Sequence, residues 1–305
     1  MRSKTLIQLA LGLLIAVAGY SSQRPSEPYT ISTNVDVVLL DASVKDPRGG
    51  YVTGLPKSAF HVTENGRSRP ISLFANVDAP VTLGLVIDNS GSMRNKRAEV
   101  VLAGLAFAKE SNSKDEFFVI NFNDSVAKGL PPSLTFTDDL QTLRAALFYG
   151  RPLGKTALYD ATASALKHLE KGHHDKRTLI VVSDGGDNAS KIPQQELMAL
   201  IESSRATIYT VELGEKDDPD LKPGVLRKIA AISGGQYYRL ENLDDVIPVF
   251  KKISKDIRSR YTIGYIPNGE EDKRRVRSIR VTAQSEGRKL AVKSRTSYMI
   301  SPAAN

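Results

Sequence analysis

The stretch that decides the fold is residues 81–93, which read VTLGLVIDNSGSM. Residues 81–87 are mostly apolar, and such a run predicts a strand buried on both faces, as in a parallel sheet covered by helices. In open α/β sheets the binding crevice lies at the carboxyl ends of the strands. The chain places Asp88, Ser90 and Ser92 at that end, and Gly91 permits a tight turn there. Three oxygen-bearing side chains from one loop suit a hard cation such as magnesium or calcium.

One loop does not complete a coordination sphere, so further ligands are expected from other strand ends. Residues 177–183, RTLIVVS, form a second predicted buried strand, which is followed by Asp184. Residues 154–160, GKTALYD, place Thr156 at the start of a predicted helix that runs to about Lys171. Taken singly, each feature has an ordinary explanation, since Asp and Ser are common turn residues and Thr is a common helix cap.

Taken together, these residues resemble the metal-ion-dependent adhesion site of the von Willebrand factor type A domain. All five positions of that motif occur in order, namely Asp88, Ser90, Ser92, Thr156 and Asp184. The resemblance implies that the Ser and Thr hydroxyls contact the metal, whereas the two Asp side chains usually act through bound water, or directly in some states. It also implies an open coordination position that the carboxylate of a protein partner fills.

The resemblance predicts a bound divalent cation. Magnesium is expected, because hydroxyl and water ligands with few direct carboxylates suit it, and calcium and manganese remain alternatives. Helix N-termini beside the site add positive potential, which favours an anionic partner. Asp187 follows the second strand closely and is interpreted as a solvated turn residue, with support of the metal loop as the alternative.

The composition is that of an ordinary globular protein, with 41% apolar and 25% charged residues in a chain of 305. This length favours about two domains. The net charge of +8 is mild and spread out, and it does not by itself indicate nucleic acid. The sequence has no cysteine, which excludes disulfides and an acylated lipoprotein cysteine within it.

The N-terminus is predicted to be a signal peptide, residues 1–22. Arg2 and Lys4 precede an apolar stretch, residues 6–18, that ends in small residues. The stretch is short for a permanent membrane span, so no stable span is expected after cleavage, although an uncleaved anchor is the alternative. The protein is therefore expected to be exported, to the periplasm, the cell envelope or the medium.

Three segments follow the predicted signal peptide. Residues 23–78 carry short strand patterns and the hairpin dipeptide Asn65-Gly66. Residues 79–258 alternate strands with helices, expected at about 94–112, 137–148, 193–204, 222–232 and 244–258. This alternation predicts an α/β fold with a doubly wound, mostly parallel sheet flanked by helices, as in Rossmann-like domains. Residues 259–305 return to strand patterns and are expected to pack with residues 30–78 as a small β module.

Two other clusters of residues are interpreted as ordinary surface features and not as binding sites. His168, His173 and His174 with Asp175 invite a zinc site, but their spacing does not fit one helical face, and a solvated turn is expected. The basic run from Lys273 to Arg280 alternates with apolar residues, which predicts one exposed face of a strand. It has no aromatic stacking platform, so nucleic acid is not an expected partner.

Three functions are compatible with these features. The favoured one is a metal-dependent binding protein of the adhesion type, and the second is a structural envelope component whose metal only stabilises the fold. The third is a metal-assisted hydrolase built on Asp88 and Asp184. A serine hydrolase needs a Gly-x-Ser-x-Gly elbow, which residues 88–92 lack, and no His is expected near the strand ends to act as a base. The protein is therefore predicted not to be an enzyme.

Overall fold

The apolar run at the start of the deciding stretch forms strand β5 (Val81–Asp88), and all of its residues are buried. The computed structural model describes residues 37–76, 78–184, 186–214, 223–267 and 276–299, and these all fall within one compact unit. The predicted signal peptide, residues 1–22, lies outside the described residues. Gly84 leaves no room for a side chain in β5, since a Cβ atom at this position would lie 2.4 Å from the Phe118 ring.

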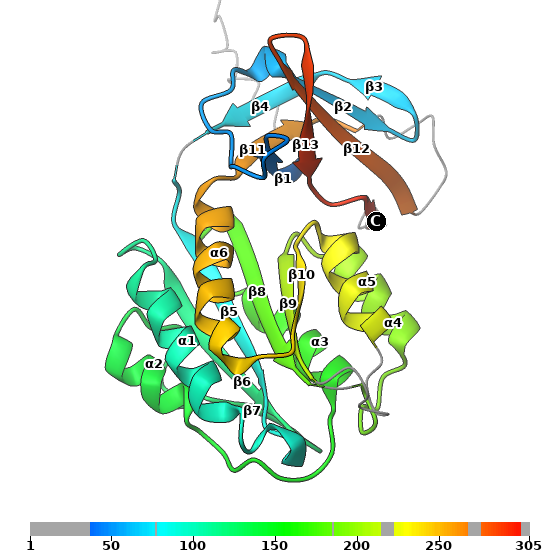
Figure 1. Ribbon diagram of the computed structural model, residues 1–305. Helices are drawn as coiled ribbons and strands as arrows, with labels where there is room; N and C mark the ends of the chain where they lie inside the picture. Colours follow the sequence, from blue (N-terminus) through cyan, green and yellow to red (C-terminus); the bar gives the residue numbers. More distant parts are fainter. Residues whose placement is uncertain (1–36, 77, 185, 215–222, 268–275, 300–305) are drawn as a thin grey trace, which may run out of the picture. The chain divides into compact units, whose positions relative to one another are not determined.

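β5 is a central strand of a six-stranded sheet in the order β10-β9-β8-β5-β6-β7 (Figure 1). The strands from β10 to β6 are parallel, and only β7 runs antiparallel, beside β6. The predicted α/β architecture is therefore confirmed, with a mixed sheet. The other strands are β6 (Glu116–Phe122), β7 (Val126–Lys128), β8 (Lys176–Ser183), β9 (Thr207–Leu213) and β10 (Tyr237–Leu240).

Helices cover both faces of this sheet, and sheet and helices together are called the α/β domain. α1 packs against α2 and α6, whereas α3 packs against α4, which in turn contacts α5 (Figure 1). Each helix begins and ends within about three residues of the range that the sequence predicts, as expected for helix termini. The helices are α1 (Arg97–Lys109), α2 (Leu140–Leu147), α3 (Leu158–Leu169), α4 (Gln194–Ser203), α5 (Pro223–Ser233) and α6 (Val246–Arg258).

A second sheet is antiparallel and combines strands from before and after the α/β domain in sequence. Its order is β3-β2-β12-β13-β1-β11-β4, with β14 paired to β12. It has its own apolar core, in which Leu40, Val62 and Ile263 are buried. The boundaries at residues 78 and 258 stay predictions. The strands are β1 (Val38–Lys45), β2 (Phe60–Glu64), β3 (Arg67–Arg69), β4 (Ile71–Ala75), β11 (Tyr261–Tyr265), β12 (Val276–Ser285), β13 (Arg288–Lys293) and β14 (Ser297–Met299).

The hairpin between β2 and β3 forms as the sequence predicts. Asn65 and Gly66 both have positive φ angles, 50° and 80°, which is the turn geometry that the Asn-Gly dipeptide favours. The predicted exposed basic face is wrong for Arg277, which is 0% exposed and lies 3.3 Å from the buried carboxylate of Glu64. Arg277 shares its face of β12 with Ile279 and Val281, so the strand alternation carries it inward.

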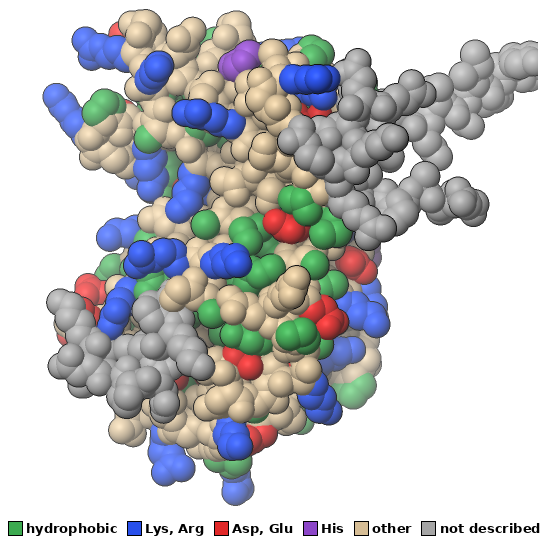
Figure 2. Space-filling view, turned by 90° about the vertical axis from the view of Figure 1, so that its right-hand side faces the viewer, with side chains coloured by type: hydrophobic (Ala, Val, Ile, Leu, Met, Phe, Trp, Pro, Cys, Tyr) green, Lys and Arg blue, Asp and Glu red, His purple; other side chains and the backbone are tan. Residues whose placement is uncertain are grey.

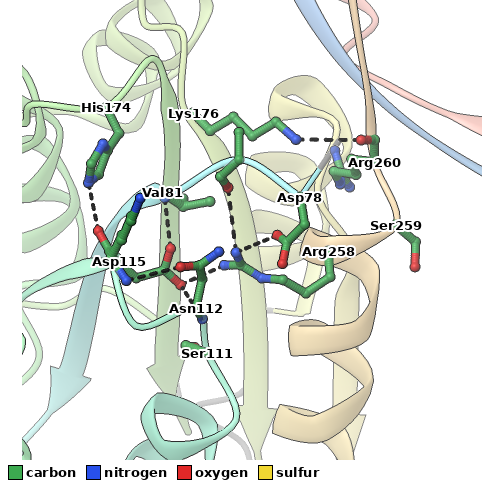
Figure 3. Close-up of polar contacts among 12 residues, drawn as sticks. Asp78, Val81, Ser111, Asn112, Asp115, His174, Lys176, Arg258, Ser259 and Arg260 are labelled. Carbon is green, nitrogen blue, oxygen red and sulfur yellow. Dashed lines mark hydrogen bonds and ion pairs between the residues drawn. The ribbon is translucent and has the colours of Figure 1, made fainter. Parts of the chain in front are cut away.

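The guanidinium of Arg258 links the last helix of the α/β domain to residues beside its first strand (Figure 3). Arg258, at the end of α6, pairs through Nη1 with Asp78 at 2.7 Å and through Nη2 with Asp115 at 2.6 Å. Asp115 also accepts the N–H of Val81 at 2.8 Å, so the carboxylate fixes the first residue of β5.

Among the described residues, no helix has the length and apolar character needed to cross a membrane.

Candidate metal centre

Two adjacent strands bring the first predicted ligands to one edge of the sheet. β5 ends at Asp88 and β8 ends at Ser183, and the two strands are paired in parallel, with Ile87 opposite Val182. The residues that follow the strands therefore emerge side by side. The loop after β5 continues into a short 3-10 turn (Gly91–Met93), which aims Ser90 and Ser92 back across the strand ends.

Asp88 is completely buried at this edge. Its Oδ1 accepts the N–H of Ser90 at 2.7 Å, and its Oδ2 accepts the Ser183 hydroxyl at 2.6 Å. Asp88 forms no ion pair with any residue that the structure describes. Burial raises the pKa of this carboxyl to about 6, against an ordinary value of 3.8, even though hydrogen bonds from Ser183 and Ser90 act in the opposite direction. A buried carboxylate without a cation is the type of group that a metal ion compensates.

Ser90, Ser92 and Asp184 form a continuous chain of hydrogen bonds. The hydroxyl of Ser92 donates to Asp184 Oδ1 at 3.0 Å and lies 3.1 Å from the hydroxyl of Ser90. The structure therefore brings together two hydroxyls of the first loop and the carboxylate that follows β8. Asp184 is 2% exposed, so both acids of the predicted motif are shielded from water.

Thr156 lies in a loop that backbone hydrogen bonds attach to the same strand ends. Its N–H donates to Asn188 Oδ1 at 2.7 Å, and its carbonyl accepts the N–H of Asn188 at 3.0 Å. Two residues earlier, the carbonyl of Gly154 accepts the N–H of Gly91 at 3.1 Å. Thr156 is 5% exposed, and its hydroxyl has no hydrogen bond to the described part of the chain. That hydroxyl therefore keeps both of its lone pairs for a ligand.

Sequence reasoning missed Lys96, which contacts the centre directly. Its Nζ lies 2.7 Å from Asp184 Oδ2 and donates to the carbonyl of Leu213 at 3.0 Å. The signal in the sequence was a basic residue four positions after Ser92, where the turn leads into α1. With Lys96, the centre holds two buried carboxylates and one ammonium group, which leaves one negative charge uncompensated.

Asp187 helps to stabilise the start of α3. It accepts the hydroxyl of Ser190, and it shares the N–H of Tyr159, at 3.2 Å, with Ser190 Oγ at 3.0 Å, so the two residues together bind a donor in the first turn of α3. The interpretation as a solvated turn residue is therefore incomplete, because the turn also caps a helix from another part of the chain. Asn188 belongs to the same turn, and it holds the Thr156 loop through both its side chain and its backbone.

The histidine cluster does not form a shared site. His168 is in α3, 8% exposed, and packs on the Phe118 ring with 4.4 Å between the centroids, so a solvated turn is wrong for this residue. Burial lowers the pKa of His168. His173 pairs with Glu116 at 2.7 Å, and His174 contacts the carbonyl of Lys114, both at the start of β6 and away from the strand ends that carry Asp88. The helix geometry buries His168 on the apolar side of α3.

The donor set fits a hard divalent cation. The centre offers hydroxyl and carboxylate oxygens, and the described residues contain no group of three or more His, Cys, Asp or Glu side chains that could hold a metal ion. Soft metals that require thiolates or several imidazoles are therefore poorly served, whereas magnesium, calcium and manganese prefer oxygen. The uncompensated charge at Asp88 has the sign that attracts a cation.

Comparison with known proteins identifies the segment that holds the centre. Residues 83–186 match the von Willebrand factor type A domain. All five residues of the predicted motif lie in this segment, and the α/β fold of the segment agrees with the match. No curated protein matches the chain.

Solved structures with similar folds agree on the architecture. A von Willebrand factor type A protein from Catenulispora acidiphila has a TM-score of 0.53 at 14% identity, covering 87% of this chain and 74% of its own. The von Willebrand factor domain of the pilus tip protein Mfa5 from Porphyromonas gingivalis has a TM-score of 0.50 at 12% identity, covering 59% and 96%. At such identities the likeness shows the fold alone.

A third structure is the proximal thread matrix protein 1 of the mussel byssus, with a TM-score of 0.49 and 15% identity. The match covers 58% of this chain but only 48% of the mussel protein, so the chain spans about half of that protein's length.

Proposed function

We propose that this chain is an exported, metal-dependent binding protein of the adhesion type. Asp88, Ser90, Ser92, Thr156 and Asp184 hold a divalent cation, with magnesium expected and calcium or manganese as alternatives. A protein partner supplies a carboxylate to the open coordination position. The observation that carries the proposal is the chain of contacts from Ser90 through Ser92 to Asp184, next to a buried Asp88 that lacks a cation.

The chemistry of the centre favours binding over catalysis. Hydroxyl ligands leave more positive charge on the metal than carboxylate ligands, so the ion attracts an outside anion. A hydrolase would need a general base near this ion, and each of the four His residues of the sequence lies on another part of the chain. The von Willebrand factor domain of a pilus tip protein has a similar fold and is consistent with a role in contact between molecules or surfaces.

The first experiment is isothermal titration of the metal-stripped full chain with magnesium. Saturable one-to-one binding is expected for the wild type, and Asp88→Ala and Ser92→Ala are expected to weaken it at least tenfold. The matched controls are Asp138→Ala and Ser133→Ala, which change the same residue types at exposed positions away from the centre. Equal losses in the controls, or no saturable binding of magnesium, calcium or manganese, would contradict the proposal.

The open coordination position has its own test. Manganese bound at the centre carries exchangeable water, and the relaxation of solvent protons reports that water. Acetate, the simplest carboxylate, is expected to displace it and lower the relaxation enhancement, whereas acetamide at the same concentration is not. If acetate has no effect, the metal has no site for a partner's acid, and the structural function, in which the ion only stabilises the fold, takes its place.

A further inference from the structure

A second site lies outside the metal centre, in a cavity of about 650 Å³. One side of the cavity is formed by α5 and the start of β10, and the other by β12, β13 and the segment that joins β13 to β14. The pairing of β12 with β13 stops at Ala283 and Leu290, and the pairing of β12 with β14 starts at Ser278, so the cavity occupies the wedge between them. This volume is in the range of sites for small organic ligands.

The cavity is lined by four basic side chains and by no acidic one. Arg227 comes from α5, Arg280 from β12 and Lys293 from β13, and Arg295 from the segment after β13. Arg227, Arg280 and Lys293 have no ion pair with any acid in the described part of the chain. α5 and β12 lie on the right of Figure 1, and Figure 2 shows that face of the molecule, on which Lys and Arg side chains gather. The cavity therefore has the charge that attracts an anion.

Arg295 is the fixed element of the site, because it is only 7% exposed. Its Nε donates to the carbonyl of Ser297 at 3.0 Å, and its Nη2 donates to the carbonyls of Ile201 and Glu202 at 3.4 and 3.3 Å. Among the described residues no hydrogen bond uses Nη1, so that nitrogen remains for a ligand. Carbonyl groups orient the guanidinium but do not neutralise its charge.

Glu202, whose backbone carbonyl contacts Arg295, has another partner for its side chain. The Glu202 carboxylate accepts the hydroxyl of Ser297 at 3.1 Å, and it forms no ion pair with the guanidinium. Burial lowers the pKa of Arg295 to about 10, and burial also lowers the pKa of Lys293. Asp41 and Glu202 favour the charged form of Arg295, and Asp256 that of Lys293, but none of these acids forms an ion pair with either cation within the described part of the chain. Arg227 and Arg280 are exposed, so contact with water accounts for their charges. It does not account for the charges of Arg295 and Lys293, which are partly removed from water.

The other residues that line the cavity indicate the uncharged part of the ligand. The Arg227 guanidinium lies over the Tyr237 ring, 5.2 Å from the centroid, an arrangement that holds the side chain in place while its N–H groups stay free. Leu290 and Val292 add apolar surface on the opposite side. A small ligand that meets these walls has an apolar or flat part next to its charged group.

We propose that this cavity binds a small organic phosphate, with the phosphate group held by Arg295, Lys293 and Arg227 and the organic part against Leu290 and Val292. Arginine binds phosphate oxygens through paired N–H groups, and such charge-assisted hydrogen bonds are the strong ones. The site is separate from the metal centre and does not depend on the function proposed for it.

The test is isothermal titration of the full chain with phenyl phosphate, in EDTA so that the metal centre is empty. Saturable binding is expected, and it is expected to be stronger than the binding of inorganic phosphate, which lacks the apolar part. The double variant R227Q/K293Q is expected to weaken phenyl phosphate binding about tenfold or more, since it removes two charge-assisted contacts.

The matched control is K228Q/K289Q. It removes the same number of charges from the same two elements, α5 and β13, at exposed positions that do not line the cavity. Its affinity for phenyl phosphate is expected to stay within about twofold of the wild type. Equal weakening in both double variants would show only a general attraction of anions and would overturn the site. Absence of saturable binding, or equal affinity for inorganic phosphate, would overturn the proposed ligand.

Discussion

Lys96 and Asp184 form an ion pair of 2.7 Å, so the ammonium group of the chain itself occupies one oxygen of a proposed metal ligand. The other oxygen of Asp184 accepts the hydroxyl of Ser92. Lys96 is held in place because it also donates to the carbonyl of Leu213 at the end of β9. A metal ion that takes up Asp184 must therefore compete with a cation that is covalently attached to the site.

The first prediction concerns this competition. Lys96→Met keeps the length and the apolar stem of the side chain but removes its charge, so magnesium is expected to bind about tenfold more tightly, which corresponds to about 1.4 kcal/mol. Titration calorimetry of the metal-stripped variant and wild type measures the difference. Arg94→Met is the control, because it removes a positive charge from an exposed position in the same loop. Equal gains in magnesium affinity in both variants would mean that the effect comes from the overall positive charge near the site and not from the ion pair between Lys96 and Asp184.

The second prediction follows from the raised pKa of Asp88. Its folded-state pKa of about 6 exceeds the ordinary 3.8, so the carboxyl contributes its full stabilisation below about pH 4 and loses it as the pH rises through 6. In EDTA at pH 7.5, Asp88→Asn is therefore expected to be more stable than the wild type by roughly 1–3 kcal/mol. Denaturant unfolding at several pH values measures this, and the difference should vanish towards pH 4.

The same variant should not bind magnesium, because a neutral amide replaces the charged ligand. Asp138→Asn controls for the loss of an exposed acid. A wild type that is as stable as Asp88→Asn at pH 7.5 without metal would show that the buried carboxyl carries no penalty, and the argument for a compensating cation would fail.

A third prediction separates Asp88 from Asp187. Asp187→Ala removes one of two acceptors of the Tyr159 N–H at the start of α3, and because Ser190 Oγ remains, a loss of stability of at most about 1 kcal/mol is expected. Magnesium affinity is expected to change by less than about threefold in Asp187→Ala, whereas Asp88→Ala should lose binding. Denaturant unfolding and calorimetry on the two variants give both readings. An equal loss of affinity in Asp187→Ala would place Asp187 among the residues that hold the metal.

Much of this arrangement is predictable from the sequence, because local signals and long-range packing agree. The apolar run before Asp88 specifies a strand buried on both faces, and Asn65-Gly66 specifies a hairpin turn with positive φ angles. The type A match covers the predicted motif, while metal binding by its five residues stays a prediction. Strand ends gather at one edge of a parallel sheet, so the meeting of Ser92 with Asp184 follows from the order of the strands.

The parts that sequence reasoning missed depend on contacts between distant residues. Lys96 reads as a solvated charge until β8 and β9 bring Asp184 and Leu213 to it. Arg277 reads as part of a basic face until the alternation of β12 places it beside Glu64, 213 positions earlier. His168 falls within the predicted helix, but its cluster reads as solvated until the packing of α3 places His168 on the buried side. In each case a polar residue finds its partner only through tertiary packing.

The last prediction concerns Arg258, which contacts two acids of different burial. The side chain of Asp115 is 0% exposed, whereas that of Asp78 is 49% exposed. Asp115 also binds the N–H groups of Val81 and Asn112, so Asp115→Ala leaves Nη2 of Arg258 and two backbone donors without their acceptor, while Nη1 keeps Asp78. A loss of roughly 2–4 kcal/mol in the free energy of unfolding is expected, against less than about 1 kcal/mol for Asp78→Ala.

Denaturant unfolding of both variants and of Arg258→Ala measures these losses. Arg258→Ala is expected to resemble Asp115→Ala more than Asp78→Ala, because the buried Asp115 then lacks its cation. The double variant of Arg258 and Asp115 should cost less than the sum of the two single changes, since the residues act on each other. Additive losses would show that Asp115 acts only through the backbone of β5, and that the ion pair at the end of α6 contributes nothing to stability.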